Sequence, residues 1–181
     1  MNKVFSKLDN YKKLQTQLKC KNLNGVPKFL KVCINRGIGF TSEQLLTSNI
    51  NEVSLLSGQY PKVTKSKKSI SNFKIRKNMK IGLKVTLREA RMYSFITKFI
   101  YLVLPKIKNF QGLDILNFDK NGNYNFGINS QLLFPEIDYS SFEKNKNQGL
   151  NITFVTTTKN KYHSFLLLKQ FKFPFATYDN W

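Results

Sequence analysis

The chain of 181 residues is poor in the residue types from which catalytic and metal sites are usually built. It contains two cysteines, one histidine, and 10 Asp+Glu against 30 Lys+Arg. Cys20 and Cys33 are too few for a disulfide framework, and no Cys-x-x-Cys pair suggests zinc or redox chemistry. His163 has no second histidine with which to form a metal site. We therefore expect no metal, no cofactor and no catalytic residues.

Long apolar runs are also missing. The longest, around residues 95–104, is interrupted by Lys98 and stopped by Pro105, and a membrane span needs about 20 apolar residues. The N-terminal segment lacks the apolar core of a secretory signal, and its first 20 residues contain no arginine, unlike a typical transit peptide. We expect no membrane span and a protein made where it works.

The chain has a large excess of positive charge, with a formal net charge of +20, but 41% hydrophobic and 14% aromatic residues are enough to build a core. We expect a single folded domain over residues 1–181. Cations spread along the entire sequence match an extended phosphate array better than one small pocket, which favours nucleic acid. An anionic membrane surface is the competing polyanion.

The periodicity of apolar residues predicts an α+β fold, an antiparallel sheet with helices packed on one face. Helices are expected over residues 1–21, 42–58, 91–104 and 160–171, and strands over 29–35, 62–65, 82–88, 123–128 and 150–158. In the first strand Leu30, Val32 and Ile34 are expected to face the core. In the last helix, Tyr162, Phe165 and Leu166 are expected to pack inward.

The polar faces of strands 29–35 and 82–88 form a candidate RNA platform. If their apolar faces point to the helices, then Lys31, Asn35, Lys84, Thr86 and Arg88 share the open face of the sheet. Lys and Arg would contact phosphates, and Asn and Thr would contact sugar or base groups. The alternative is an ordinary solvated sheet face.

A second candidate is the basic segment 66–80. Between residues 57 and 93 eleven Lys and Arg meet one carboxylate, that of Glu89. We interpret residues 66–80 as a flexible basic loop that orders on RNA, with Phe73 and Ile75 as apolar contacts. The alternative is a solvated hairpin tip with Phe73 tucked under the domain.

Two weaker patterns have ordinary explanations. Gly37 and Gly39 follow a strand, but Ser42 stands where a dinucleotide loop needs its third glycine. Glu136 and Asp138 have no base, metal set or pocket signal beside them, so a structural turn is expected rather than a catalytic pair.

Several blocks, in order from about residue 26 to residue 175, carry a family resemblance. They are VCINRGIG, LSGQYPKVTKSKKSISNFKIRKNMKIGLKVTLREARMY, LVLPKIKNFQGL, FDKNGNYNFGI, LLFPEIDY and ITFVTTT. Together they resemble the bacterial-type large-subunit ribosomal protein numbered five, which binds 5S rRNA. The resemblance implies a structural, non-enzymatic RNA-binder with an antiparallel sheet and packed helices. Its place would be the central protuberance, with 5S rRNA on the sheet side.

The resemblance also implies particular residues and partners. The family's RNA contacts carry over to Asn35, Gln59, Thr86 and Arg88. Our full set of expected RNA-binding residues is Lys31, Asn35, Arg36, Gln59, Thr64, Lys65, Lys84, Thr86 and Arg88. The family's extended loop, which faces the intersubunit space and peptidyl-site tRNA, maps onto Lys67, Lys68, Ser69, Phe73, Lys74, Arg76, Lys77 and Lys80. Other expected partners are large-subunit rRNA, neighbouring ribosomal proteins and, through an intersubunit bridge, a head protein of the small subunit.

The chain departs from the family pattern in places. The family's usual Leu-Arg-Gly-Glu-Arg is here Leu87-Arg88-Glu89-Ala90-Arg91. This puts a carboxylate close to Arg88 and leaves the RNA pairing of Arg88 open. The resemblance says little about residues 176–181, a short C-terminal tail, whereas residues 1–25 are expected to form an N-terminal helical segment.

The compartment and the function class have open alternatives. Richness in Lys, Asn, Ile and Phe indicates an A+T-biased genome. With no transit peptide expected, we predict an organelle-encoded protein of the mitochondrial matrix, with the plastid stroma and the bacterial cytoplasm as alternatives. A free RNA-processing or RNA-binding factor and a membrane-surface binder are the alternative functions.

Overall fold

In the described part of the chain, five strands pair antiparallel into one sheet in the order β2-β3-β1-β5-β4. The computed structural model describes residues 7–39, 43–137 and 149–176, with side chains from Asn10 onward. The strands are β1 Phe29–Gly37, β2 Lys62–Lys65, β3 Lys80–Leu87, β4 Tyr124–Ile128 and β5 Leu150–Thr156. All five predicted strands are confirmed within a few residues. The α+β prediction is confirmed.

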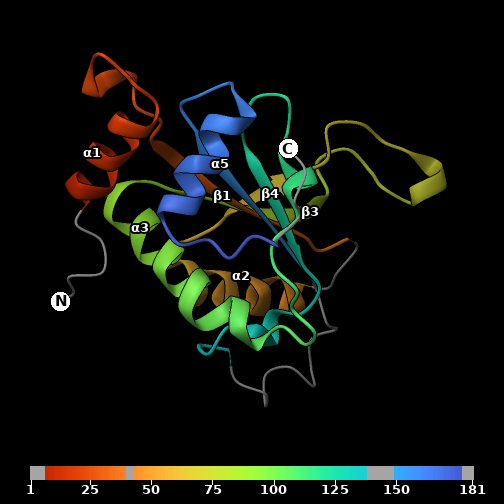
Figure 1. Ribbon diagram of the computed structural model, residues 1–181. Coiled ribbons are helices and arrows are strands. Elements are labelled where there is room, and N and C mark those ends of the chain that lie inside the picture. The colour runs from red at the N-terminus through yellow and green to blue at the C-terminus, as the bar shows by residue number, and fades with distance from the viewer. Residues whose placement is uncertain (1–6, 40–42, 138–148, 177–181) are drawn as a thin grey trace.

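Helices cover one face of this sheet, as Figure 1 shows for α2, α3 and α5. The helices are α1 Lys7–Gln17, α2 Glu43–Ser57, α3 Glu89–Lys98 and α5 Lys161–Gln170. The path of α3 continues through a π turn, Phe99–Val103, and a 3-10 turn, Leu104–Lys106. Predicted features at Ser42, Asp138 and residues 177–181 lie outside the described residues.

The core lies between the helices and the apolar side of the sheet. Met92, Phe95, Ile96 and Phe99 are buried along one side of α3 and its continuation, as a 3.6-residue period requires. The ring of Phe99 lies 5.4 Å from that of Phe154 on β5. Among the described residues, no helix lies on the opposite side of the sheet.

Two predicted core positions are wrong. Leu30 is 51% exposed while Phe29 is buried, because the pairing of β1 with β5 shifts register between Phe29 and Lys31 and changes which side chains face inward. Tyr162 is 49% exposed, and α5 instead buries Leu167 and Leu168.

A projecting hairpin joins β2 to β3. We call residues 66–80 the basic hairpin; Figure 1 shows it extending away from the body of the molecule. Its arms are hydrogen bonded, with Ser66 N donating to Met79 O at 2.8 Å and Ile70 N donating to Ile75 O at 2.9 Å. A 3-10 turn, Ser71–Phe73, closes the tip, and Lys74 takes a left-handed conformation with φ 54°. The segment predicted to be a flexible loop is thus a hairpin whose two arms are joined by backbone hydrogen bonds.

Candidate nucleic-acid interface

The side of the sheet away from the helices carries polar side chains in two cross-strand rows. Residues directly opposite each other on antiparallel strands share a face. One row runs Lys62, Lys84, Asn35, Asn151, and the next runs Thr86, Cys33, Thr153, Asn125. All eight side chains are exposed or partly exposed. We call this surface the open face.

Most of the predicted platform residues meet there. Asn35, Lys84 and Thr86 stand in the two rows, and Lys31 lies opposite Val155 of β5 on the same face. Arg88 is exposed but lies beyond the strand, as the residue that precedes α3. The sheet therefore brings four of the residues together and places Arg88 at the margin.

Thr64 and Lys65 extend this surface along β2. Thr64 stands opposite Gly82, and a Cβ at Gly82 would come within 2.9 Å of Thr64 Oγ1 and of Arg36 O. Glycine at position 82 is thus what lets Thr64 lean over β3. Lys65 is exposed at the end of the strand.

The open face is electrostatically one-sided. None of the five strands contains Asp or Glu. Lys62 and Lys84 lie directly opposite each other on β2 and β3, and like charges in such a pair are mutually destabilising. An anion bound across the two strands would relieve that repulsion, which is the electrostatic requirement for a phosphate-binding surface.

Arg36 is a correction to the predicted interface, because the structure buries it. Its side chain is 0% exposed, and its Nη1 donates to Glu52 Oε2 of α2 at 2.8 Å. Arg36 therefore faces the helices, and its guanidinium is not on the surface that would meet RNA. Burial lowers the pKa of Arg36, while Glu52 acts in the opposite direction. The alternation of β1 carried this information, since Arg36 follows Val32 and Ile34 at two-residue spacing.

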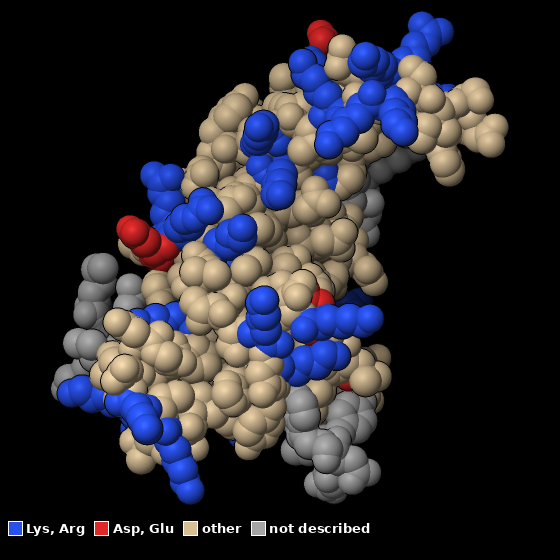
Figure 2. Space-filling view, turned by 90° about the horizontal axis from the view of Figure 1, so that it is seen from above, with Lys and Arg blue, Asp and Glu red and all other residues tan. Residues whose placement is uncertain are grey.

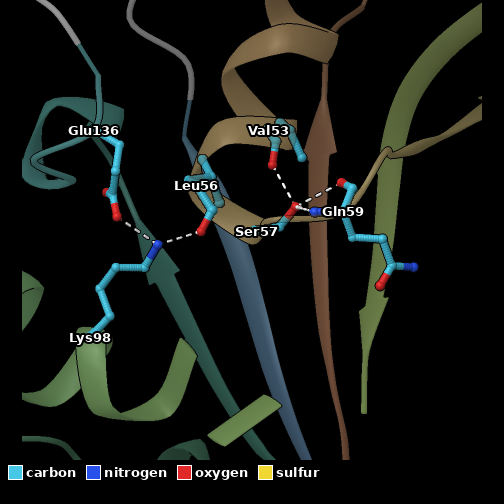
Figure 3. Close-up of polar contacts among 6 residues, drawn as sticks. All are labelled: Val53, Leu56, Ser57, Gln59, Lys98 and Glu136. Carbon is cyan, nitrogen blue, oxygen red and sulfur yellow. Dashed lines mark hydrogen bonds and ion pairs between the residues drawn. The ribbon is translucent and has the colours of Figure 1, made fainter. Parts of the chain in front are cut away.

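Gln59 lies in the turn that follows α2, and its side chain points away from that helix in Figure 3. Ser57 shapes the turn. Its Oγ accepts from Gln59 N at 3.3 Å, and its hydroxyl lies within donating distance of Val53 O at 2.6 Å and Gln59 O at 2.9 Å. Gly58, with φ 65°, supplies the left-handed residue that ends the helix. The backbone of Gln59 is thus fixed, while its partly exposed side chain points away from the helix.

Lys98 supports the same turn from α3. Its Nζ donates to Leu56 O and forms an ion pair with Glu136 at 2.8 Å, as Figure 3 shows. The ammonium therefore satisfies a carbonyl in the last turn of α2, where a positive charge is favoured. Glu136 has this structural role, in keeping with the expectation of a turn rather than a catalytic pair.

The basic hairpin presents cations and apolar side chains together. Every Lys and Arg from Lys65 to Lys80 is exposed, and Figure 2 shows them gathered on the projecting end at the upper right. Phe73 is 72% exposed and Ile70 is 45% exposed. The interpretation that Phe73 is tucked under the domain is therefore wrong. Lys80 Nζ lies 3.4 Å from Glu43 Oε1, an exposed pair that contributes little to stability.

The sequence-based prediction missed the part of the open face on β4 and β5. Asn151, Thr153 and Asn125 stand in the two rows beside Asn35 and Cys33. The alternation of Asn151 and Thr153 with buried Ile152 and Phe154 already indicated an exposed polar side. What the sequence lacked was the strand order, which places β5 next to β1.

Comparison with known proteins gives the family. A family model described as "Ribosomal protein L5" matches residues 22–76, and a second model, for the C-terminus of the same ribosomal family, matches residues 80–175. The chain belongs to the ribosomal protein L5 family. It is 48% identical over 166 residues to the large ribosomal subunit protein uL5c of Gracilaria tenuistipitata var. liui, which covers 91% of this chain and 92% of that protein. It is 49% identical over 174 residues to uL5 of Thermotoga sp. (strain RQ2), with 92% and 94% covered.

Membership of this family makes the chain a structural constituent of the large ribosomal subunit rather than an enzyme. Within the described ranges, no cluster of three or more His, Cys, Asp or Glu side chains could hold a metal ion. The helices of those ranges include none that is long and apolar enough to cross a bilayer. Another relative, uL5c of Tetradesmus obliquus, is 45% identical over 87% of both chains, so the ribosomal relatives include plastid and bacterial forms.

Proposed function

We propose that this member of the ribosomal protein L5 family binds 5S rRNA in the central protuberance through its open face. The observation that carries the proposal is the acid-free pair of rows across β2, β3, β1 and β5, in which Lys62 and Lys84 stand directly opposite each other. A folded RNA backbone presents phosphates and 2′-hydroxyls over a broad surface, and lysines interleaved with Asn and Thr match both groups.

The residues at the margins of the sheet have separate roles in this proposal. Arg88, exposed before α3, contacts a phosphate. Gln59, in the turn after α2, donates a hydrogen bond to the RNA from its side-chain amide. Thr64 and Lys65 extend the contact along β2. Arg36 is not part of the surface and instead joins β1 to α2 through Glu52.

Equilibrium binding of 5S rRNA to open-face variants tests the proposal. Arg88→Ala and Lys84→Ala are each expected to weaken binding by about 1–3 kcal/mol, the range for a hydrogen bond to a charged group whose partner is left behind. Lys120→Ala, an exposed cation in the turn before β4 and off the rows, is the matched control and should bind like the wild type. Unchanged affinity of both variants would remove the open face, together with its margin at Arg88, from the 5S rRNA site.

We propose in addition that the basic hairpin contacts peptidyl-site tRNA from the intersubunit side and that the exposed surface around it bridges to a head protein of the small subunit. The support is the geometry and charge of the hairpin. Phe73 is exposed at the tip of two hydrogen-bonded arms, and the segment from Lys65 to Lys80 carries cations and no acidic residue. Aromatic and basic side chains together suit a nucleic acid that offers both bases and phosphates. Crosslinking of the hairpin to tRNA in assembled ribosomes tests this contact, and crosslinks only to large-subunit rRNA would contradict it.

For the compartment, we propose a mitochondrial ribosome, with plastid and bacterial ribosomes as alternatives. The support is the Lys-, Asn-, Ile- and Phe-rich composition. Mass spectrometry of ribosomes purified from each compartment of the source organism is the test, and finding the chain only in plastid or bacterial ribosomes would overturn the mitochondrial assignment.

A further inference from the structure

The open face changes in chemical character from one edge to the other. On β2 and β3 the first row begins with Lys62 and Lys84, whereas on β5 and β4 the two rows end in Asn151, Thr153 and Asn125, with no charged side chain. A neutral polar surface has no charge with which to neutralise a phosphate, so its contacts release no counterions. It can make hydrogen bonds only where a donor or acceptor is placed opposite it.

One side chain on this neutral half is held in a defined orientation. Thr153 Oγ1 donates to Asn125 Oδ1 at 2.8 Å across β5 and β4. The bond occupies the carbonyl end of the Asn125 amide and directs its NH₂ group, which has two donor hydrogens, away from Thr153. Among the described residues no protein acceptor meets that NH₂ group, and Asn125 is exposed.

A glycine lies beside it. The row through Lys84, Asn35 and Asn151 ends on β4 at Gly127, which is exposed and has no side chain. Asn151 Oδ1 would lie 3.6 Å from a Cβ at that position, so the Asn151 amide leans toward the bare β4 backbone. A glycine within a strand often marks a point of close approach by a ligand. The side-chain amides of Asn125 and Asn151 thus lie on either side of Gly127, where the β4 edge of the sheet has no side chain.

We propose that Asn125, Asn151 and Thr153 form a subsite that reads ribose 2′-hydroxyls and base edges of the bound RNA, while the lysines of β2 and β3 hold its phosphates. This inference rests on the proposed binding of RNA to the open face. It assigns phosphate binding to the β2–β3 half of that face and recognition of sugars and bases to the β4–β5 half. Amide donors and acceptors match both groups: base edges distinguish one RNA sequence from another, and 2′-hydroxyls distinguish RNA from DNA. The β4–β5 half therefore determines specificity more than affinity.

Salt dependence separates the two kinds of contact. Each phosphate neutralised by a cation adds about 0.7–0.9 to the slope of log affinity against log salt, and a contact to a sugar or base adds nothing. With 5S rRNA as the probe, Lys84→Ala should reduce the magnitude of that slope by about 0.7–0.9, the contribution of one phosphate contact. Asn125→Ala and Asn151→Ala should each lower affinity about five-fold at every salt concentration, the loss of one neutral hydrogen bond, without changing the slope.

Two further variants sharpen the test. Thr153→Val keeps a β-branched side chain but removes the hydroxyl that orients Asn125, so its effect and that of Asn125→Ala should not add in the double variant. Asn51→Ala, an exposed amide on α2 at the helical side, is the matched control and should bind like the wild type. Thermal unfolding of each variant checks that the fold is retained.

Probing of 2′-hydroxyl reactivity supplies a second readout. Riboses protected by the wild-type protein should become reactive again with Asn125→Ala and Asn151→Ala, and stay protected with Lys84→Ala at saturating protein. If the wild type binds and neither Asn variant alters affinity or reactivity, the subsite is wrong while the proposed function stands. If the wild type itself does not bind 5S rRNA through the open face, both are overturned.

Discussion

The ion pair between Arg36 and Glu52 is a buried polar contact between β1 and α2. Both side chains are almost fully buried, with 0% and 7% exposure, and Nε and Nη2 of Arg36 have no hydrogen-bond partner in the described structure. A buried charge whose partner is removed is strongly destabilising, whereas a well-packed apolar pair in the same place is close to neutral. Arg36 therefore contributes to the shape of the open face without lying on it.

Glu52→Leu should lower the free energy of unfolding by about 3–5 kcal/mol, because it leaves the Arg36 cation buried without its carboxylate. Urea denaturation measures the change. The double variant Arg36→Met, Glu52→Leu is the control and should fall within about 1 kcal/mol of the wild type, since it removes both charges and two unpaired donors. A single variant no less stable than the double variant would show that the pair is not what joins β1 to α2.

Glu89, the first residue of α3, has a strained backbone conformation. Its φ is 49°, in the left-handed region that glycine tolerates and glutamate does not favour. The family resemblance places a glycine at this position. Glu89→Gly should therefore raise the free energy of unfolding by about 0.5–1 kcal/mol in a denaturation experiment, by relieving backbone strain. Ala90→Gly, one residue further along α3, should instead lower the free energy of unfolding, because glycine is a poorer helix former than alanine.

Strain and charge at Glu89 are separable. Glu89→Gln keeps the backbone strain but removes the carboxylate beside Arg88, so it should strengthen 5S rRNA binding with little effect on unfolding. Equal affinity for Glu89→Gln and the wild type would mean that the carboxylate does not weaken the Arg88 contact.

At the scale of the element, the basic hairpin stands apart from the sheet that carries it. Its cations are exposed, and the hydrogen bonds given above join its own two arms. Replacing residues 66–79 by a two-residue Asn-Gly turn between Lys65 and Lys80, which are paired across β2 and β3, closes the same two strands. The shortened protein should keep most of its 5S rRNA affinity while impairing subunit joining or tRNA placement. A large loss of 5S rRNA affinity would show that the hairpin is part of the primary RNA site.

Local sequence patterns were sufficient to find the helices and strands. Alternation through Val32 and Ile34, and again through Val85 and Leu87, located β1 and β3, and the spacing of Met92, Phe95 and Phe99 located α3. These patterns depend only on which side of an element meets the core. They also predicted that Asn35, Lys84 and Thr86 would share a face.

Other features depend on tertiary contacts and could not be read locally. The register shift after Phe29 exposes Leu30, and it results from pairing with β5, far away in sequence. The alternation of β1 placed Arg36 on the buried side, but its ion pair could not be read locally because its partner Glu52 lies on another element. The place of Asn125 on the open face required the order β1-β5-β4, which the periodicity of a single strand does not contain.

At the scale of the whole molecule, charge and shape act together. The net charge of +20 draws the chain to any polyanion, but the helical side, the open face and the basic hairpin direct different groups outward. Non-specific attraction of this kind weakens steeply with salt, whereas neutral hydrogen bonds in the rows do not. Selectivity for one RNA should therefore increase as salt is raised.

Competition binding at physiological salt tests the central claim most directly. Labelled 5S rRNA is bound to the full chain and challenged with unlabelled 5S rRNA, with an equal mass of other rRNA, and with anionic lipid vesicles. We predict that only unlabelled 5S rRNA displaces the label efficiently, and that this preference is lost when Asn35, Lys84 and Arg88 are replaced together by alanine. Equal displacement by all three competitors would contradict 5S rRNA recognition by the open face.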